Sequence, residues 1–286
     1  MATLHLRSAL IFVFLLSSFS HLQASPDLIF TTINVPGAPC TSASKINARD
    51  QIVGGYCAAN GGSLSFLWDK GDFVTLSAVP GSRNQALGIN DQGQIVGEYV
   101  DDQEISHGYF WENGIVRVID VPGAIHSVAT DINERGQIVG VFIDSSGMTG
   151  GFLLDGGVFS LIEVSGAAFT RVTGINSRGQ IVGFYQDAQL VHGFLWDSGI
   201  ITNIDAPGAF SFTTTEDLNA ESHIVGFYDG IGGRQSFIYA KGIFTSLEFP
   251  LTVRDASALG INNKGNVVGE YVDTTNQTRG FLLSRR

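Results

Sequence analysis

The chain has few basic residues and, after its first 25 residues, no long apolar run. It contains 16 Lys and Arg against 27 Asp and Glu, a formal net charge of −11 at pH 7, and the basic residues form no cluster. Because phosphate binding needs a basic surface, the composition argues against nucleic acid as a partner. A membrane-spanning helix needs ~20 apolar residues. We therefore expect a soluble chain that does not span a membrane.

The first 25 residues have the pattern of a secretory signal peptide. Arg7 gives a short basic start, an apolar stretch runs from Ala9 to Phe19, and the small residue Ala24 follows at a cleavage point. No cysteine follows the apolar stretch directly, so we expect no lipoprotein anchor. The sequence thus predicts a secreted or periplasmic protein whose residues 26–286 form a single domain.

Cysteine is scarce as well. Cys40 and Cys57 are the two cysteines, and both lie in the first repeat region, on either side of one predicted pair of strands. Export permits a disulfide between them. Two buried thiols are the alternative, and the distance between the residues decides between the two.

The sequence also lacks the usual signatures of catalysis. It contains no Gly-x-Ser-x-Gly elbow, no His-Glu-x-x-His, no Walker loop and no dinucleotide fingerprint. We therefore assign no catalytic residue, no metal ligand and no cofactor.

What the chain does contain is one motif, Ile-Asn-x-x-Gly-Gln-Ile-Val-Gly or a close variant, repeated six times. A period of this length is typical of repeat architectures. The copies begin 43 residues apart, at Ile46, Ile89, Ile132, Ile175, Leu218 and Ile261.

Each repeat unit reads as four short strands. In the second unit these are residues 86–90, 94–100, 107–111 and 115–121, rich in Ile, Val, Phe and Tyr and bounded by Gly, Asn and Asp. Four strands in ~40–45 residues are typical of one blade of a β-propeller. The last unit stops after its third strand, and the segment 28–38 near the N-terminus resembles the missing fourth. The sequence therefore predicts an all-β, six-bladed propeller that the N-terminal strand closes.

The strands that follow the motif resemble a known family. His107-Gly108-Tyr109-Phe110-Trp111 and the similar segment 192–196 resemble the HAF repeat of bacterial extracellular proteins, with Gly in place of Ala. The resemblance covers the mature chain and implies an exported repeat protein, but no defined activity. Trp-Asp pairs at 68–69 and 196–197 resemble WD40 repeats, which we attribute to shared architecture.

The residues that recur in the units have structural interpretations. Asn in Asn-x-x-Gly holds a turn through its side chain, with a ring of ligands as the alternative. The recurring Tyr and Trp residues are expected in the core between blades, with platforms for carbohydrate as the alternative. His107 and His192 lie about two units apart, too far to share a metal, so we expect hydrogen bonds at a strand start. One pattern suggests calcium binding, because calcium prefers carboxylate oxygens and four acids recur after the second strand. These are Asp101, Asp144, Asp187 and Asp273.

Variable loops on a rigid scaffold are where function tends to lie. The longer connections, before the first strand and after the second, fall on one side of the ring. Charges just before the first strand alternate with Gly88, Gly174 and Gly260, and would surround the mouth of a central channel. Ordinary solvated loop charge is the alternative. The candidate ligand-binding residues are Lys45, Arg83, His126, Asp131, Arg171, Asp217 and Asp255.

Three functions fit these observations. The first is a non-catalytic binding module, acting as a monomer on a glycan or on an envelope or extracellular protein. The second is a hydrolase or lyase acting on extracellular polysaccharide, which needs two acids ~5–10 Å apart, with Asp131 and Asp217 as the pair. The third is a passive structural repeat protein. The missing catalytic motifs favour the first.

Overall fold

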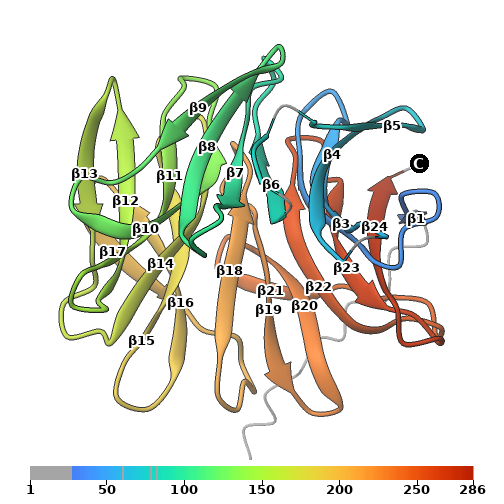
Figure 1. The fold of residues 1–286 in the computed structure, drawn as a ribbon. Helices are drawn as coiled ribbons and strands as arrows, with labels where there is room; N and C mark the ends of the chain where they lie inside the picture. Colours follow the sequence, from blue (N-terminus) through green and yellow to red (C-terminus); the bar gives the residue numbers. More distant parts are fainter. Residues whose placement is uncertain (1–27, 60, 78, 82, 286) are drawn as a thin grey trace, which may run out of the picture.

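The computed structural model describes residues 28–59, 61–77, 79–81 and 83–285. The expected signal peptide, residues 1–25, lies outside this range. Every regular element in the described residues is a β-strand (Figure 1). In the same part of the chain, no helix is long and apolar enough to cross a membrane.

The strands follow the repeat, four to a unit, and pair in antiparallel order within each unit. The first unit contains β2 (Thr41–Ile46), β3 (Ile52–Cys57), β4 (Ser63–Asp69) and β5 (Asp72–Thr75). The second contains β6 (Arg83–Ile89), β7 (Ile95–Val100), β8 (Ser106–Glu112) and β9 (Ile115–Ile119). The third contains β10 (Ala124–Ile132), β11 (Ile138–Asp144), β12 (Thr149–Asp155) and β13 (Val158–Ile162).

The later units repeat this order. The fourth contains β14 (Phe169–Ile175), β15 (Ile181–Gln186), β16 (Val191–Asp197) and β17 (Ile200–Ile204). The fifth contains β18 (Thr213–Leu218), β19 (Ile224–Gly230), β20 (Gly233–Ala240) and β21 (Ile243–Ser246). The last contains β22 (Arg254–Ile261), β23 (Val267–Val272) and β24 (Thr278–Arg285), with β1 (Leu28–Ile33) as its fourth strand.

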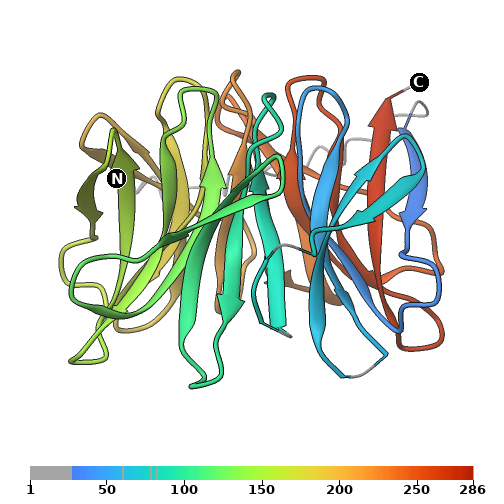
Figure 2. The ribbon, with the colours of Figure 1, turned by 45° about the horizontal axis from the view of Figure 1, so that its top comes forward.

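The two ends of the chain meet in this last sheet. β1 pairs with β24 in antiparallel register, from Leu28 opposite Arg285 to Ile33 opposite Gly280. Figure 2 shows the blue N-terminal strand beside the red C-terminal one. A single parallel bridge, Ser63 to Arg83, joins the first two units into one sheet.

The first strand of each unit contacts the first strands of its neighbours. These six central strands are β2, β6, β10, β14, β18 and β22, and β22 in turn contacts β2. Antiparallel order places the turns after the central strands at one end of the molecule, the turn end. The connections between second and third strands, and those leading into each central strand, lie at the other end, which we call the loop end.

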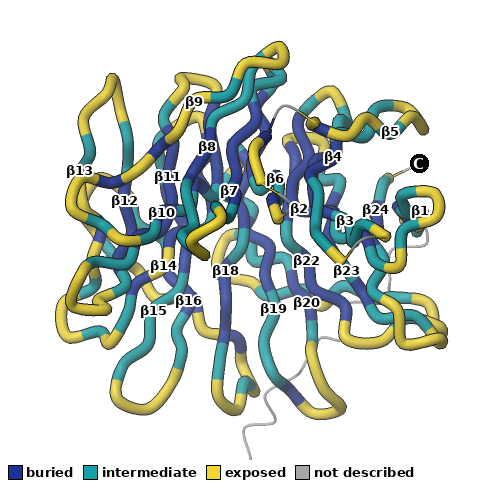
Figure 3. Tube along the Cα trace, viewed as in Figure 1, coloured by how far each residue is buried: buried dark blue, intermediate teal, exposed yellow. Residues whose placement is uncertain are grey.

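Apolar side chains fill the spaces between neighbouring sheets. Exposed residues, yellow in Figure 3, lie mainly in the connections and outer strands. The glycine of Ile-Val-Gly makes this close packing feasible. A Cβ on Gly97 would lie 2.0 Å from the carbonyl oxygen of Gln85 and 2.8 Å from the ring of Tyr109. The motif therefore needs glycine because backbone and aromatic ring occupy the space of a side chain.

The recurring asparagine does more than hold its turn. In the third unit, Asn133 Oδ1 accepts hydrogen bonds from the backbone N–H of Arg135 and Gln137, at 3.0 and 3.1 Å. This confirms the predicted turn role. Its Nδ2 also donates to the backbone oxygen of Asn176 in the next unit, at 3.0 Å.

The same bond links every pair of neighbouring units. The donors are Asn47, Asn90, Asn133, Asn176, Asn219 and Asn262, each to the equivalent carbonyl of the next unit. The last bond runs from Asn262 back to Asn47 at 3.0 Å. All six asparagines are at most 4% exposed. This set, which we call the asparagine cycle, ties the units together at the turn end.

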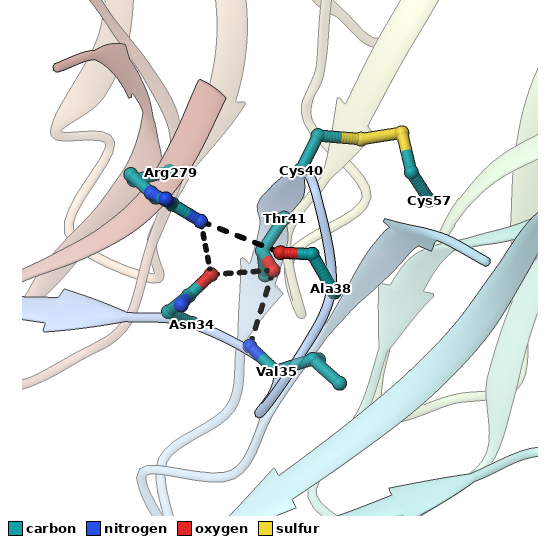
Figure 4. Close-up of a disulfide and its surroundings, with 7 residues drawn as sticks. All are labelled: Asn34, Val35, Ala38, Cys40, Thr41, Cys57 and Arg279. Atoms are coloured by element: carbon teal, nitrogen blue, oxygen red, sulfur yellow. Dashed lines mark hydrogen bonds between the residues drawn. A yellow bond between two sulfur atoms is a disulfide. The ribbon is translucent and has the colours of Figure 1, made fainter. Parts of the chain in front are cut away.

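A second set of contacts fastens the N-terminal segment (Figure 4). Arg279 donates from Nη1 to Asn34 Oδ1 at 2.9 Å and from Nε to Asp273 Oδ2 at 3.1 Å. Beyond Asn34, the structure joins Cys40 and Cys57 in a disulfide, with their Cα atoms 5.1 Å apart. The bridge crosses the pair β2 and β3, so it fixes the start of the first sheet.

Candidate functional site

The candidate charges lie within the central strands and not before them. Lys45, Asp131 and Asp217 are each the second-last residue of β2, β10 and β18. The expectation that they precede the first strand is wrong, because these strands begin several residues earlier than the apolar pattern suggested. The three side chains consequently lie toward the turn end and not among the loops.

These three residues form one buried ion cluster. Lys45 Nζ lies 2.7 Å from Asp217 Oδ1 and 3.3 Å from Asp131 Oδ2, and it also donates to the carbonyl oxygen of Glu216 at 3.2 Å. The three charged residues are 4–5% exposed. A backbone group also binds the cluster, since Asp131 Oδ2 accepts the N–H of Ile175 at 2.9 Å. We call Lys45, Asp131 and Asp217 the central triad.

Glycines in the alternate units make room for the triad. A Cβ on Gly88 would lie 2.6 Å from the Cα of Asp131 and 2.9 Å from its Oδ1. Gly174 stands in the same relation to Asp217, and Gly260 to Lys45, at 3.0 Å from the neighbouring Cα in each case. The predicted alternation of charge and glycine is thus a packing requirement of the strand interior.

Burial and mutual attraction set the protonation of the triad. Burial alone lowers the pKa of Lys45, but the charges of Asp131 and Asp217 outweigh it and leave the pKa raised. The pKa of Asp131 is also raised, because burial and the charge of Asp217 exceed the opposing effect of Lys45. Both carboxylates are already bound to the same ammonium group, so the triad provides no unengaged acid and base for hydrolysis.

A small cavity of about 70 Å³ borders the triad and the turns around Asn47, Asn133 and Asn219. A larger cavity, of about 260 Å³, lies toward the loop end. We call it the loop-end pocket. Its residues come from the second, third and fourth units: Ser106, His126, Val128, Val141, Ile143, Thr149 and Arg171.

Two predicted site residues therefore meet in the loop-end pocket, His126 from β10 and Arg171 from β14. His126 Nδ1 accepts the backbone N–H of Ser106 at 3.0 Å. Arg171 is exposed, and its guanidinium carbon lies 5.9 Å from the ring centre of Phe184. Sequence reasoning missed Ser106 and Thr149, which carry no signal beyond their place at a strand start.

The remaining candidates lie elsewhere. Arg83, at the start of β6, forms an exposed ion pair with Glu104. Asp255, in β22, is exposed and has a positive φ of 46°. Of the seven predicted residues, the structure thus groups three in the central triad and two in the loop-end pocket.

His107 and His192 make the hydrogen bonds expected for them, each between two carboxylates. His107 Nδ1 lies 2.9 Å from Asp120 Oδ2, and its Nε2 lies 3.3 Å from Asp101 Oδ2. Burial lowers the pKa of His107, but the hydrogen bonds and charges of Asp120 and Asp101 together raise it above its ordinary value. His192 has the equivalent partners Asp205 and Asp187.

The acids of the predicted calcium pattern each accept hydrogen bonds from groups in their own turn. Asp273 Oδ1 accepts from the hydroxyl and N–H of Thr275 and from the N–H of Gln277, which lowers the pKa of Asp273. Asp144 makes the same bonds in the third unit. The described residues include no group of three or more His, Cys, Asp or Glu arranged to hold a metal ion. Calcium binding stays a prediction.

Comparison with known proteins identifies the fold but no family. Neither a family model nor a curated protein sequence matches the chain. The resemblance to HAF repeats therefore stays a prediction.

Solved structures do match over most of the chain. One is a mutant of the lectin AAL from Aleuria aurantia in complex with Fucα1-6GlcNAc, at 11% identity and a TM-score of 0.54, covering 84% of this chain and 90% of the lectin. AofleA from Arthrobotrys oligospora aligns at 12% identity and a TM-score of 0.56, covering 91% of this chain and 88% of its own.

A third match is the β-propeller domain of the Trilobed protease from Pyrococcus furiosus, at 9% identity and a TM-score of 0.51, covering 86% of this chain and 84% of that one. The chain has a β-propeller-like repeat fold. At these identities the similarity speaks for the fold alone.

Proposed function

We propose that this chain is an exported, closed six-bladed propeller that acts as a non-catalytic carbohydrate-binding module. The pairing of β1 with β24 and the asparagine cycle support closure and the number of blades. The signal-like N-terminus and the Cys40–Cys57 disulfide support export, because disulfides persist in oxidising compartments.

The loop-end pocket is the observation that carries the binding function. It has an apolar floor of Val128, Val141 and Ile143 and a polar rim that includes His126 and Arg171. Ligand pockets in proteins combine apolar walls with a few placed polar groups, and their volumes are ~300–1,000 Å³. A cavity of about 260 Å³ fits one small ring better than an extended polymer. Sugar rings have both hydroxyl groups and an apolar face.

The direct test is binding of purified residues 26–286 to a broad array of glycans and cell-wall fragments, with calcium and with chelator. We expect hits that Arg171→Gln weakens and that chelator leaves unchanged. An array without specific hits would contradict the carbohydrate function and favour a protein partner. Hits lost with chelator would instead favour the calcium prediction at the acids represented by Asp101.

The same preparation tests the enzymatic alternative. Asp131→Ala with Asp217→Ala removes both carboxylates of the triad. Turnover of a polysaccharide by the parent chain, lost in this double variant while binding persists, would overturn the non-catalytic function. No turnover in the parent agrees with it.

A further inference from the structure

The loop-end pocket contains two polar groups whose bonding capacity the chain leaves unused. Arg171 has no hydrogen-bond acceptor and no ion-pair partner within the described residues, and its guanidinium lies over the ring of Phe184. Three other arginines of the loop end have partners in the described residues. Arg83 pairs with Glu104, Arg279 with Asp273, and Arg234 donates to Ser257 Oγ at 2.7 Å.

His126 is the second group. Its Nδ1 accepts the N–H of Ser106, so in the neutral ring the proton is on Nε2. In the described part of the chain, Nε2 has no partner. The backbone of β8 thus fixes the tautomer and leaves an N–H donor at the pocket, whose rim also contains the hydroxyl groups of Ser106 and Thr149.

The floor of the pocket has no polar side chain. Val128 and Val141 are cross-strand partners on β10 and β11, and Ile143 follows on the same face of β11. Such a surface packs against C–H groups and gains little from hydroxyls. A matching ligand therefore combines one apolar face, hydroxyl groups at its edge and a negative charge for Arg171.

Resting on the carbohydrate-binding function, we propose that the loop-end pocket binds an acidic sugar, a uronic acid unit whose carboxylate pairs with Arg171. Its apolar ring face lies on Val128 and Val141, and its edge hydroxyl groups receive the Nε2–H of His126. A guanidinium matches a carboxylate in a two-bonded geometry that neutral hydroxyls do not reproduce.

Neighbouring acids limit the charge that the pocket accepts. The charge of Arg171 acts on Glu98 and Glu216, although burial is the larger influence and raises the pKa of both. A ligand with a single carboxylate next to Arg171 avoids these groups, whereas a highly sulfated or phosphorylated polymer meets them. The pocket thus favours a uronate unit over a densely sulfated or phosphorylated polymer.

The test measures binding of four probes by titration calorimetry: galacturonic acid, its methyl ester, galactose, and a short oligogalacturonide. The methyl ester keeps the ring and removes the charge. We expect galacturonic acid and the oligogalacturonide to bind. Arg171→Gln should lower the affinity for both roughly tenfold or more, as for loss of a charged hydrogen bond. Arg178→Gln is the matched control, because Arg178 is an exposed arginine at the turn end, bonded to Ser222.

Each outcome has a distinct meaning. Charge-dependent binding that is lost in Arg171→Gln and kept in Arg178→Gln supports the proposal. Equal binding of acid and ester, or acid binding that Arg171→Gln leaves intact, overturns the uronate assignment while carbohydrate binding stands. If no probe and no glycan on an array binds, both proposals fail. Thermal unfolding of each variant verifies that the exposed substitutions leave the fold intact.

Discussion

The ammonium group of Lys45 lies 2.7 Å from the carboxylate of Asp217, although the two residues belong to the first and fifth units of the repeat. Asp131 of the third unit completes the contact from another side. Three strands that are distant in sequence thus share one buried charge cluster. Removing one partner of such a cluster costs about 3–5 kcal/mol, because the remaining charges stay buried without compensation.

The first prediction concerns this cluster. Lys45→Met should lower the free energy of unfolding by about 3–5 kcal/mol at pH 7.5. Without the opposing charge of Lys45, burial raises the pKa of Asp131 further above that of the unfolded chain. Stability is then retained at low pH and lost as the pH rises through the folded pKa, so the deficit should shrink at pH 5. Urea unfolding at the two pH values measures both effects.

The triple variant Lys45→Met, Asp131→Asn, Asp217→Asn is the control. It leaves no buried charge at this position, so its deficit should be smaller than the sum of the separate changes. A deficit in Lys45→Met that is small and independent of pH would mean that the triad is not a coupled unit.

The asparagine cycle gives a second prediction. Asn133→Ala removes two bonds that hold its own turn and the bond to the carbonyl of Asn176. Because these groups are buried, we expect a loss of about 2–3 kcal/mol in urea unfolding. Ser177→Ala, at an exposed position in the neighbouring turn, should stay within ~0.5 kcal/mol of the parent. Equal stability of the two variants would contradict a structural role for the cycle.

The third prediction concerns attachment of the N-terminal strand. Arg279→Ala removes the bonds to Asn34 and Asp273, and with them one side-chain tie between the residue after β1 and the last hairpin. We expect residues 28–33 to exchange amide hydrogen roughly tenfold faster or more, as a charged bond is worth about 1.5–3 kcal/mol. Exchange in the third and fourth units should not change. Unaltered protection of β1 would show that its backbone pairing suffices.

A fourth prediction follows from His107, whose pKa is raised by Asp120 and Asp101. A raised folded pKa means that the ion pairs contribute fully below the unfolded value of about 6.5. Their contribution is lost as the pH rises through the folded pKa. His107→Gln should therefore differ from the parent more at pH 5.5 than at pH 8.5, a difference that thermal unfolding at both pH values detects. A constant difference would mean that His107 stays neutral.

The sequence predicted those features that depend on spacing within one unit. The strands, the Asn turns and the role of β1 follow from local periodicity and from turn chemistry repeated in register. The turn geometry persists even where two turns lack glycine, since Asp50 and Ser222 take its place with a positive φ of 62° and 58°. The starts of the strands were harder to predict, because polar residues at the start of the central strands interrupt the apolar pattern.

The functional region could be predicted only in part, because it is assembled across units. His126 and Arg171 were candidates as loop charges, but nothing in their spacing shows that Ser106 and Thr149 share their pocket. Likewise, the sequence gives the alternation of Lys45, Asp131 and Asp217 with glycine, but not that the lysine lies between both acids. Such relations depend on the curvature that places strands around one axis.

The alternation of charge and glycine in the central strands also has an evolutionary reading. Each charged residue packs against a glycine of the preceding unit, as Asp131 does against Gly88 and Asp217 against Gly174. In the closed ring that we propose, an odd number of repeats would place two charges or two glycines next to each other. The alternation therefore requires an even number of repeats. Gene duplication or deletion could lengthen or shorten this chain safely only two repeats at a time.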